Sequence, residues 1–60
     1  MMKTDRENMI ETALNCGATI LENKDDYVKV LSSNLKLIST MFFNKDGSYN
    51  FNKEIIHEWN

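Results

Sequence analysis

The chain has 60 residues, with 7 basic and 9 acidic side chains and a formal net charge of -2, which allows one small domain over residues 1–60 and only marginal stability from its own core. Basic and acidic residues are interspersed, which argues against a nucleic-acid-binding face, because such a face needs clustered Lys and Arg. A single cysteine excludes an intramolecular disulfide, and no apolar run is long enough to cross a bilayer. We therefore expect a cytoplasmic protein that makes no membrane contact.

The first predicted element is a helix that begins near residue 5. Thr4 and Glu7 have the spacing of a capping box, in which each side chain accepts a hydrogen bond from the other residue's backbone N–H. Gly17 leaves two endings open: it is either the C′ residue that terminates the helix, or an interior residue of a helix that continues to about residue 23. Apolar residues recur on one side of this helix, namely Met9, Ile10, Ala13 and Leu14.

A polar break at residues 23–26 separates this helix from the central stretch, residues 25–43. On a helical wheel the apolar side chains of the central stretch share about half of the circumference. Such a wide stripe is typical of a helix that is covered by more than one neighbour. The pattern therefore predicts a second helix, joined to the first as an antiparallel helical hairpin. The apolar half contains Tyr27, Val28, Val30, Leu31, Leu35, Leu37, Ile38, Met41 and Phe42.

The central stretch has an alternative interpretation as two strands. Several of its residues are β-branched, and the serines at residues 32–33 favour a turn. A hairpin turning there would oppose Val30 to Leu35 and Lys29 to Lys36. The alternative fold class is therefore α+β, one helix followed by an antiparallel β-meander.

The last third of the chain predicts an aromatic turn and a short helix. Asp46 and Gly47 lie between aromatic residues, which is a strong signal for a tight hairpin. Beyond them, Ile55 and Trp59 are placed at helical spacing, so residues 52–60 are predicted to form a short terminal helix that must dock on the rest. The predicted fold is mainly α: a helical hairpin with a C-terminal aromatic loop or hairpin and a short terminal helix.

One segment, residues 44–55, resembles a calcium-binding EF-hand loop. Oxygen-bearing side chains stand at ligand positions one, three, five and nine, but Tyr49 replaces the glycine of the sharp turn and Ile55 replaces the bidentate glutamate. No nucleotide-binding glycine motif is present, and the chain has too few Cys and His residues for a zinc site. We therefore expect no metal site and no cofactor. The oxygen-bearing residues are Asn44, Asp46, Ser48 and Asn52.

Catalytic residues are not indicated either. Cys16 and His57 are a nucleophile and a base by residue type, but the sequence lacks both an acid-His-nucleophile spacing and a glycine-rich oxyanion loop. We therefore expect the protein not to be an enzyme.

The remaining candidate function is protein binding. Aromatic residues are enriched at the energetic centres of interfaces, and in this chain they are concentrated in the last third. We predict a small regulator or inhibitor that binds another protein and forms a homodimer; the identity of the partner is not indicated. The alternative is a small nucleic-acid-binding regulator built on the helical hairpin. The candidate protein-binding residues are Phe42, Phe43, Tyr49 and Trp59.

Overall fold

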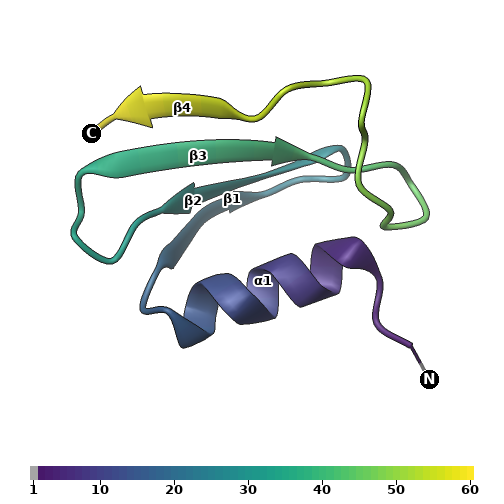
Figure 1. The fold of residues 1–60 in the computed structure, drawn as a ribbon, viewed down its shortest axis with the longest axis horizontal. Coiled ribbons are helices and arrows are strands. Elements are labelled where there is room, and N and C mark those ends of the chain that lie inside the picture. The colour runs from purple at the N-terminus through teal and green to yellow at the C-terminus, as the bar shows by residue number, and fades with distance from the viewer. Residues whose placement is uncertain (1) are drawn as a thin grey trace.

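The computed structural model describes residues 2–60 as one helix followed by four strands. The elements in chain order are α1 (Asp5–Asn15), β1 (Thr19–Asn23), β2 (Tyr27–Leu31), β3 (Leu37–Phe42) and β4 (Ile56–Trp59). The strands form one antiparallel sheet in the order β1-β2-β3-β4. Helix α1 lies against one face of this sheet (Figure 1). The fold is therefore α+β.

The predicted mainly α fold is wrong, and so is the helical hairpin. Residues 25–43, predicted as a second helix, contain β2, a turn and β3, while the tail predicted as a terminal helix contains β4. The alternative, one helix followed by an antiparallel meander, has the right class. The reason is that β2 pairs along its whole length with β3 and over residues 28–31 with β1. Such cross-strand pairing stabilises a strand, but a local helical wheel does not contain it.

Helix α1 begins at the predicted capping box. The Thr4 hydroxyl accepts a hydrogen bond from the Glu7 backbone N–H at 3.2 Å, and the Glu7 carboxylate lies 3.5 Å from the Thr4 backbone nitrogen. At the other end, Gly17 has a φ of 85°, a left-handed conformation that glycine adopts without a Cβ clash. Its N–H donates to the Leu14 carbonyl at 3.0 Å. The helix therefore ends before Gly17, as the first of the two predicted endings required.

The polar break at residues 23–26 forms the turn between β1 and β2. The Lys24 N–H closes this turn on the Tyr27 carbonyl at 2.9 Å. Arg6 reaches the same turn from α1: its guanidinium donates to the Asp25 carbonyl at 3.2 Å and also to the Lys24 carbonyl. The break is thus confirmed, but it joins two strands, and Arg6 attaches the start of α1 to it.

The turn between β2 and β3 is longer than the alternative interpretation predicts. Val30 faces Ser39 across the sheet and not Leu35, so the predicted register is wrong. Residues 32–36 form the turn, in which the Asn34 side-chain oxygen accepts a backbone N–H at 3.0 Å. Leu35 lies in the left-handed region with a φ of 62°. These local contacts extend the turn beyond the two serines to Lys36.

The predicted Asp-Gly turn is present in the segment that leads from β3 to β4. Gly47 has a φ of 90°, and an isolated bridge pairs Phe43 with Tyr49 around the turn. The Gly47 carbonyl accepts the Arg6 backbone N–H at 2.9 Å, and the Tyr49 N–H donates to the Asp5 carboxylate at 3.0 Å. The first turn of a helix has backbone N–H groups without partners inside the helix. The loop supplies one of these partners and so packs on the start of α1.

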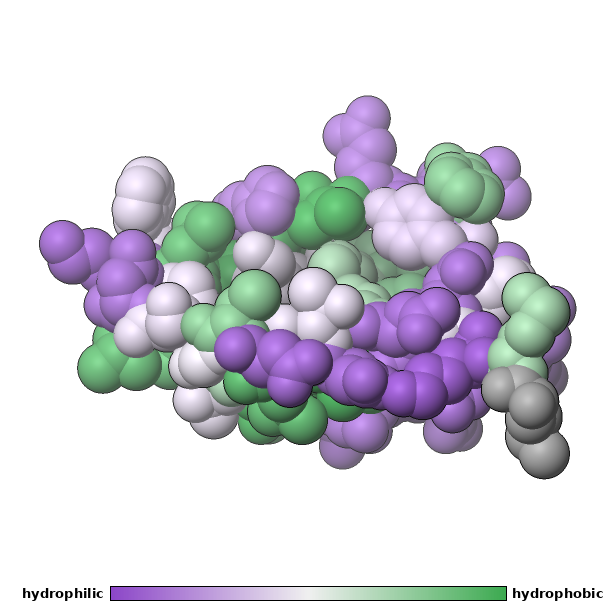
Figure 2. Space-filling view, turned by 60° about the horizontal axis from the view of Figure 1, so that its bottom comes forward, coloured by the Kyte–Doolittle hydropathy of each residue, from purple (hydrophilic) through white to green (hydrophobic). Residues whose placement is uncertain are grey.

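The core lies between α1 and the sheet and is small. The buried apolar residues within residues 2–60 are Val28, Val30 and Phe43. No residue of α1 is fully buried, and hydrophobic side chains also reach the surface on the helix side (Figure 2). No helix within residues 2–60 is long and apolar enough to cross a membrane. The partly buried residues around the core are Met9, Ile10, Ala13, Ala18, Ile20, Met41 and Tyr49.

Candidate protein-binding surface

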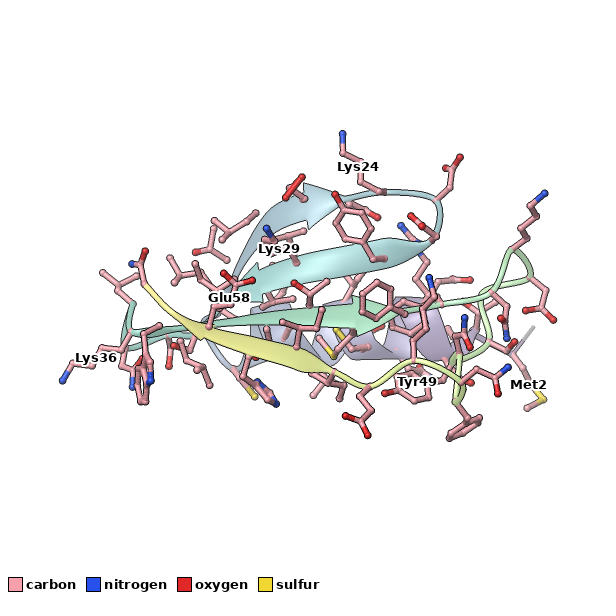
Figure 3. The ribbon with its side chains drawn as sticks, turned by 90° about the horizontal axis from the view of Figure 1, so that it is seen from above. Met2, Lys24, Lys29, Lys36, Tyr49 and Glu58 are labelled. Carbon is pink, nitrogen blue, oxygen red and sulfur yellow. The ribbon has the colours of Figure 1, made fainter. Side chains whose placement is uncertain are left out.

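The face of the sheet that points away from α1 is uncovered within residues 2–60 (Figures 1 and 3). Val28 and Val30 pack against residues of α1, so the alternate residues of β2 lie on the opposite face. Residues paired across antiparallel strands share a face, which extends the assignment to β3 and β4. We call the apolar residues of this surface the open-face patch. It consists of Tyr27, Leu31, Ile38, Phe42 and Ile56.

An uncovered face of an antiparallel sheet is usually polar, but this one is mixed: two apolar pairs are separated by Lys29 and Thr40, and Glu58 lies opposite Ile38. Tyr27 and Phe42 are paired across the strands, with ring centroids 6.3 Å apart and a tilt of 56°. The Lys53 ammonium lies 5.1 Å from the centre of the Phe42 ring. Toward the other end of the sheet, Leu31 and Ile38 are directly opposite each other. The patch thus runs from an aromatic end to an aliphatic end.

Three polar groups interact with one another along one margin of the patch, on β1 and β2. The Tyr27 hydroxyl donates to the Glu22 carboxylate at 3.0 Å, and the Lys29 ammonium lies 3.3 Å from the second oxygen of that carboxylate. The Tyr27 hydroxyl, and after it Lys29, lowers the pKa of Glu22 below its ordinary value. The same hydrogen bond raises the pKa of Tyr27, because the phenol is held next to a negative charge. The charges on this margin are therefore paired with each other.

The residues predicted for protein binding occupy different parts of the molecule. Phe42 lies on the open face, whereas Phe43 is buried, with 3% of its surface exposed. Tyr49 packs edge-on between Phe43 and Phe51, with ring centroids 5.9 Å and 4.9 Å away. Trp59 is 83% exposed at the end of β4, opposite Leu37. The structure therefore does not bring these four residues into one patch.

A shallow pocket of about 370 Å³ lies beside the first turn of α1. It is lined by Arg6, Asp25, Asn44, Lys45 and Gly47. The Arg6 guanidinium, one of three charged groups in the wall, donates hydrogen bonds to the turn between β1 and β2 and lies 5.9 Å from the centre of the Phe43 ring. These contacts give Arg6 a structural role. The pocket therefore lies where α1 meets the turn between β1 and β2.

The two residues that by type could act in catalysis belong to different elements. Cys16 is exposed at the C-terminal end of α1. His57 is paired with Ser39 across β3 and β4, and its Nδ1 atom lies 2.9 Å from the Ser39 hydroxyl. No second partner orients the His57 ring within residues 2–60, so this contact is a cross-strand hydrogen bond that links β4 to its neighbour.

The calcium-like segment uses its carboxylate internally. Both the backbone N–H and the hydroxyl of Ser48 donate to the Asp46 carboxylate, at 2.9 Å and 2.6 Å. These hydrogen bonds lower the pKa of Asp46. Within residues 2–60, no cluster of three or more His, Cys, Asp or Glu side chains is placed to hold a metal ion. Asp46 therefore stabilises a turn.

Most of the open-face patch was absent from the predicted site, which included Phe42 alone. The missing residues are Tyr27, Leu31, Ile38 and Ile56. A signal for two of them was present in the alternative interpretation, because strand alternation places Tyr27 and Leu31 on the face opposite Val28 and Val30. The wrong helical assignment merged both faces into one stripe and concealed the second.

No protein-family model, curated protein or solved structure matches this chain.

Proposed function

We propose that this chain is a small non-enzymatic interaction module, a regulator or inhibitor that binds another protein through the open-face patch. The observation that carries this proposal is the uncovered sheet face with apolar side chains from β2, β3 and β4. Apolar side chains gathered on one surface of a protein are a feature of protein-binding sites. The proposed interaction takes place in the cytoplasm, in keeping with a single cysteine that lies exposed on the surface.

The chemistry of the face favours a protein partner. Tyr27 and Phe42 supply aromatic contact area, which interfaces use at their centres. The charges of Glu22 and Lys29 are paired with each other, and Glu58 adds a further carboxylate to this face, opposite Ile38. The proposed partner therefore presents an apolar surface with a weakly charged surround.

A nucleic-acid partner is not proposed. The helical hairpin on which that alternative was built is absent from residues 2–60, and basic side chains do not converge on one face. Lys24 and Lys36 lie in turns at opposite ends of β2, with Lys29 on the strand between them (Figure 3). Lys29 is paired with Glu22, and Arg6 is bound to the turn between β1 and β2.

The test compares two substitutions of one kind at two positions. Ile38→Lys places a charge at the aliphatic end of the open-face patch, where the flexible lysine stem leaves its ammonium in water. Leu35→Lys makes the same chemical change at a side chain that is 60% exposed in the turn beyond β2. Each variant and the wild type are used as immobilised bait in a lysate of the source cells, and captured proteins are identified by mass spectrometry.

We expect a set of proteins that the wild type and Leu35→Lys capture equally and that Ile38→Lys loses by tenfold or more, which about 1.4 kcal/mol of lost binding free energy would produce. The two variants must first show the far-UV circular dichroism of the wild type. Equal capture by Ile38→Lys would contradict the assignment of the open face. Capture of RNA alone, sensitive to salt, would contradict a protein partner.

A further inference from the structure

Strand β4 forms one edge of the sheet, and neither a bulge nor a lysine nor a proline protects it. In natural sheets a free edge is protected by a bulge, a lysine or a proline. The opposite edge, β1, has an irregularity between Ile20 and Glu22. Strand β4 pairs with β3 without a register shift, and its sequence (IHEW) contains neither lysine nor proline. All four of its residues are exposed, and no segment lies beyond it within residues 2–60 (Figure 3).

The hydrogen bonds of β3 determine which backbone groups of β4 face outward. The Asn60 N–H donates to the Lys36 carbonyl at 2.9 Å. In an antiparallel ladder, hydrogen-bonded pairs alternate with non-bonded pairs. The pairs that follow are Trp59 with Leu37, which is non-bonded, and Glu58 with Ile38, which is bonded.

The same alternation holds on the other side of β3. The Ser32 N–H donates to the Leu37 carbonyl at 2.8 Å, so the backbone of Leu37 points toward β2. The backbone N–H and C=O groups of His57 and Trp59 therefore point to the free edge of the sheet. They are donors and acceptors for an additional strand.

We infer that β4 pairs antiparallel with β4 of a second copy of this chain, about a two-fold axis at His57. In this register the backbone groups of His57 meet those of His57 in the second copy, and Trp59 lies opposite Ile55 of that copy. On the other face, Ile56 lies opposite Glu58. Such an interface is isologous, since the same strand meets itself. The inference does not depend on what binds the open-face patch.

The chemistry of the side chains selects this register. An axis at Glu58 would set two carboxylates directly opposite each other, which is destabilising. An axis at Ile56 would oppose Glu54 to Glu58. With the axis at His57, no two carboxylates within residues 55–59 are opposed. Trp59, 83% exposed in one copy, gains an apolar neighbour, because an aromatic residue pairs favourably with a β-branched one.

The pairing has a geometric consequence for the whole assembly. Residues opposite each other in an antiparallel pair lie on the same face, so both copies of α1 cover the same side of an extended eight-stranded sheet. The two open-face patches then form one continuous surface on the other side.

Disulfide trapping tests the register. In a Cys16→Ser background, His57→Cys places two thiols across the axis, where bonded partners have Cα atoms about 5.5 Å apart, a distance that a disulfide spans. Glu58→Cys is the matched control, since residue 58 lies opposite residue 56 of the second copy. Under mild oxidation at low protein concentration, we expect His57→Cys to run as a disulfide-linked dimer and Glu58→Cys to stay a monomer. Equal or preferential linking of Glu58→Cys would overturn the inference.

The mass of the wild-type protein supplies a test that needs no variant. Light scattering at about 100 µM is expected to give twice the 7.0 kDa of one chain. His57→Pro removes an N–H that points to the free edge and leaves the backbone hydrogen bonds to β3 intact, a position where edge strands tolerate proline. It also removes the side-chain hydrogen bond to Ser39. It is expected to give the monomer mass with unchanged far-UV circular dichroism. A wild-type monomer at this concentration would overturn the inference.

Discussion

Thr4 and Gly47 lie so close together that a Cβ atom on Gly47 would come within 2.7 Å of the Thr4 Cβ atom. Thr4 caps α1, and Gly47 is in the turn that follows β3. The contact therefore joins two segments that are distant in the sequence. Gly47 also holds the start of the helix through its backbone, because its carbonyl accepts the Arg6 N–H at 2.9 Å.

Gly47→Ala is predicted to lower the free energy of unfolding by about 2–3 kcal/mol, which combines left-handed backbone strain with a clash. Gly17→Ala is the matched control. Gly17 has a similar φ of 85°, but its nearest neighbour, the Ser33 Cβ, would be 3.4 Å away. It should cost about 1–2 kcal/mol from strain alone. Urea unfolding measures both, and equal losses would show that the Thr4 contact contributes nothing.

Val28→Ala is predicted to destabilise the fold by about 2–3 kcal/mol, because the side chain is fully buried and its removal leaves a cavity under α1. Leu31→Ala, on the open face, is predicted to cost less than about 1 kcal/mol. Leu31 is thus not the core residue that the helical prediction implied. The measurement is the urea concentration at the midpoint of unfolding, compared between variants whose dependence of unfolding free energy on urea (the m-value) is the same. A larger loss for Leu31→Ala would place a covering element on the open face.

The sequence predicts the ends of elements better than their type. The capping box at Thr4, the stop at Gly17 and the turn at Gly47 each depend on a few adjacent residues, so they were recognisable. The tail is different, because Ile56 and Trp59 belong to a strand only through pairing with β3. That contact joins residues far apart in the chain, and helical spacing in a short segment cannot exclude it.

The central stretch was misassigned for a reason that concerns function. Val28 and Val30 face the core, while Tyr27 and Leu31 face the open side. Because Tyr27 and Leu31 add apolar residues to the open face, and Lys29 alone is polar in β2, the alternation that marks a half-buried strand is weak. The same side chains that form the open-face patch therefore produced the wide apolar stripe of a helix. Phe42 is a predicted site residue because aromatic residues are concentrated in the last third of the chain. The sequence does not predict its position on the open face.

Acid is predicted to destabilise the protein through Asp46. The Ser48 hydroxyl and N–H donate to the Asp46 carboxylate and lower its pKa from the ordinary value of 3.8. A carboxyl group with a lowered pKa in the folded state contributes stability that is present above its ordinary pKa and lost as pH falls through the folded pKa. The Tm of the wild type should therefore fall as pH is lowered below 3.8.

Asp46→Asn is the variant that isolates this effect. It removes the titrating group and retains an acceptor for the Ser48 N–H, so the Tm should be lower near neutral pH and should change less in acid. Glu22, whose pKa is also lowered, titrates in both proteins and provides the common background. An identical acid profile for wild type and Asp46→Asn would contradict the role of the turn.

Leu35→Asn is predicted to stabilise the fold. Leu35 has a φ of 62° in the turn between β2 and β3 and is 60% exposed. A leucine there carries left-handed strain of about 1–2 kcal/mol, whereas asparagine tolerates this conformation because its short polar side chain bonds locally. The Leu35 carbonyl accepts the Asn60 side-chain N–H at 2.8 Å, and the substitution retains that backbone contact. The expected gain in the free energy of unfolding is about 0.5–1 kcal/mol, measured by urea unfolding. Leu35→Ala, which removes the exposed side chain but not the strain, should show no gain. If it stabilises the protein as much as Leu35→Asn does, exposure of the leucine and not its backbone conformation is the source of the instability.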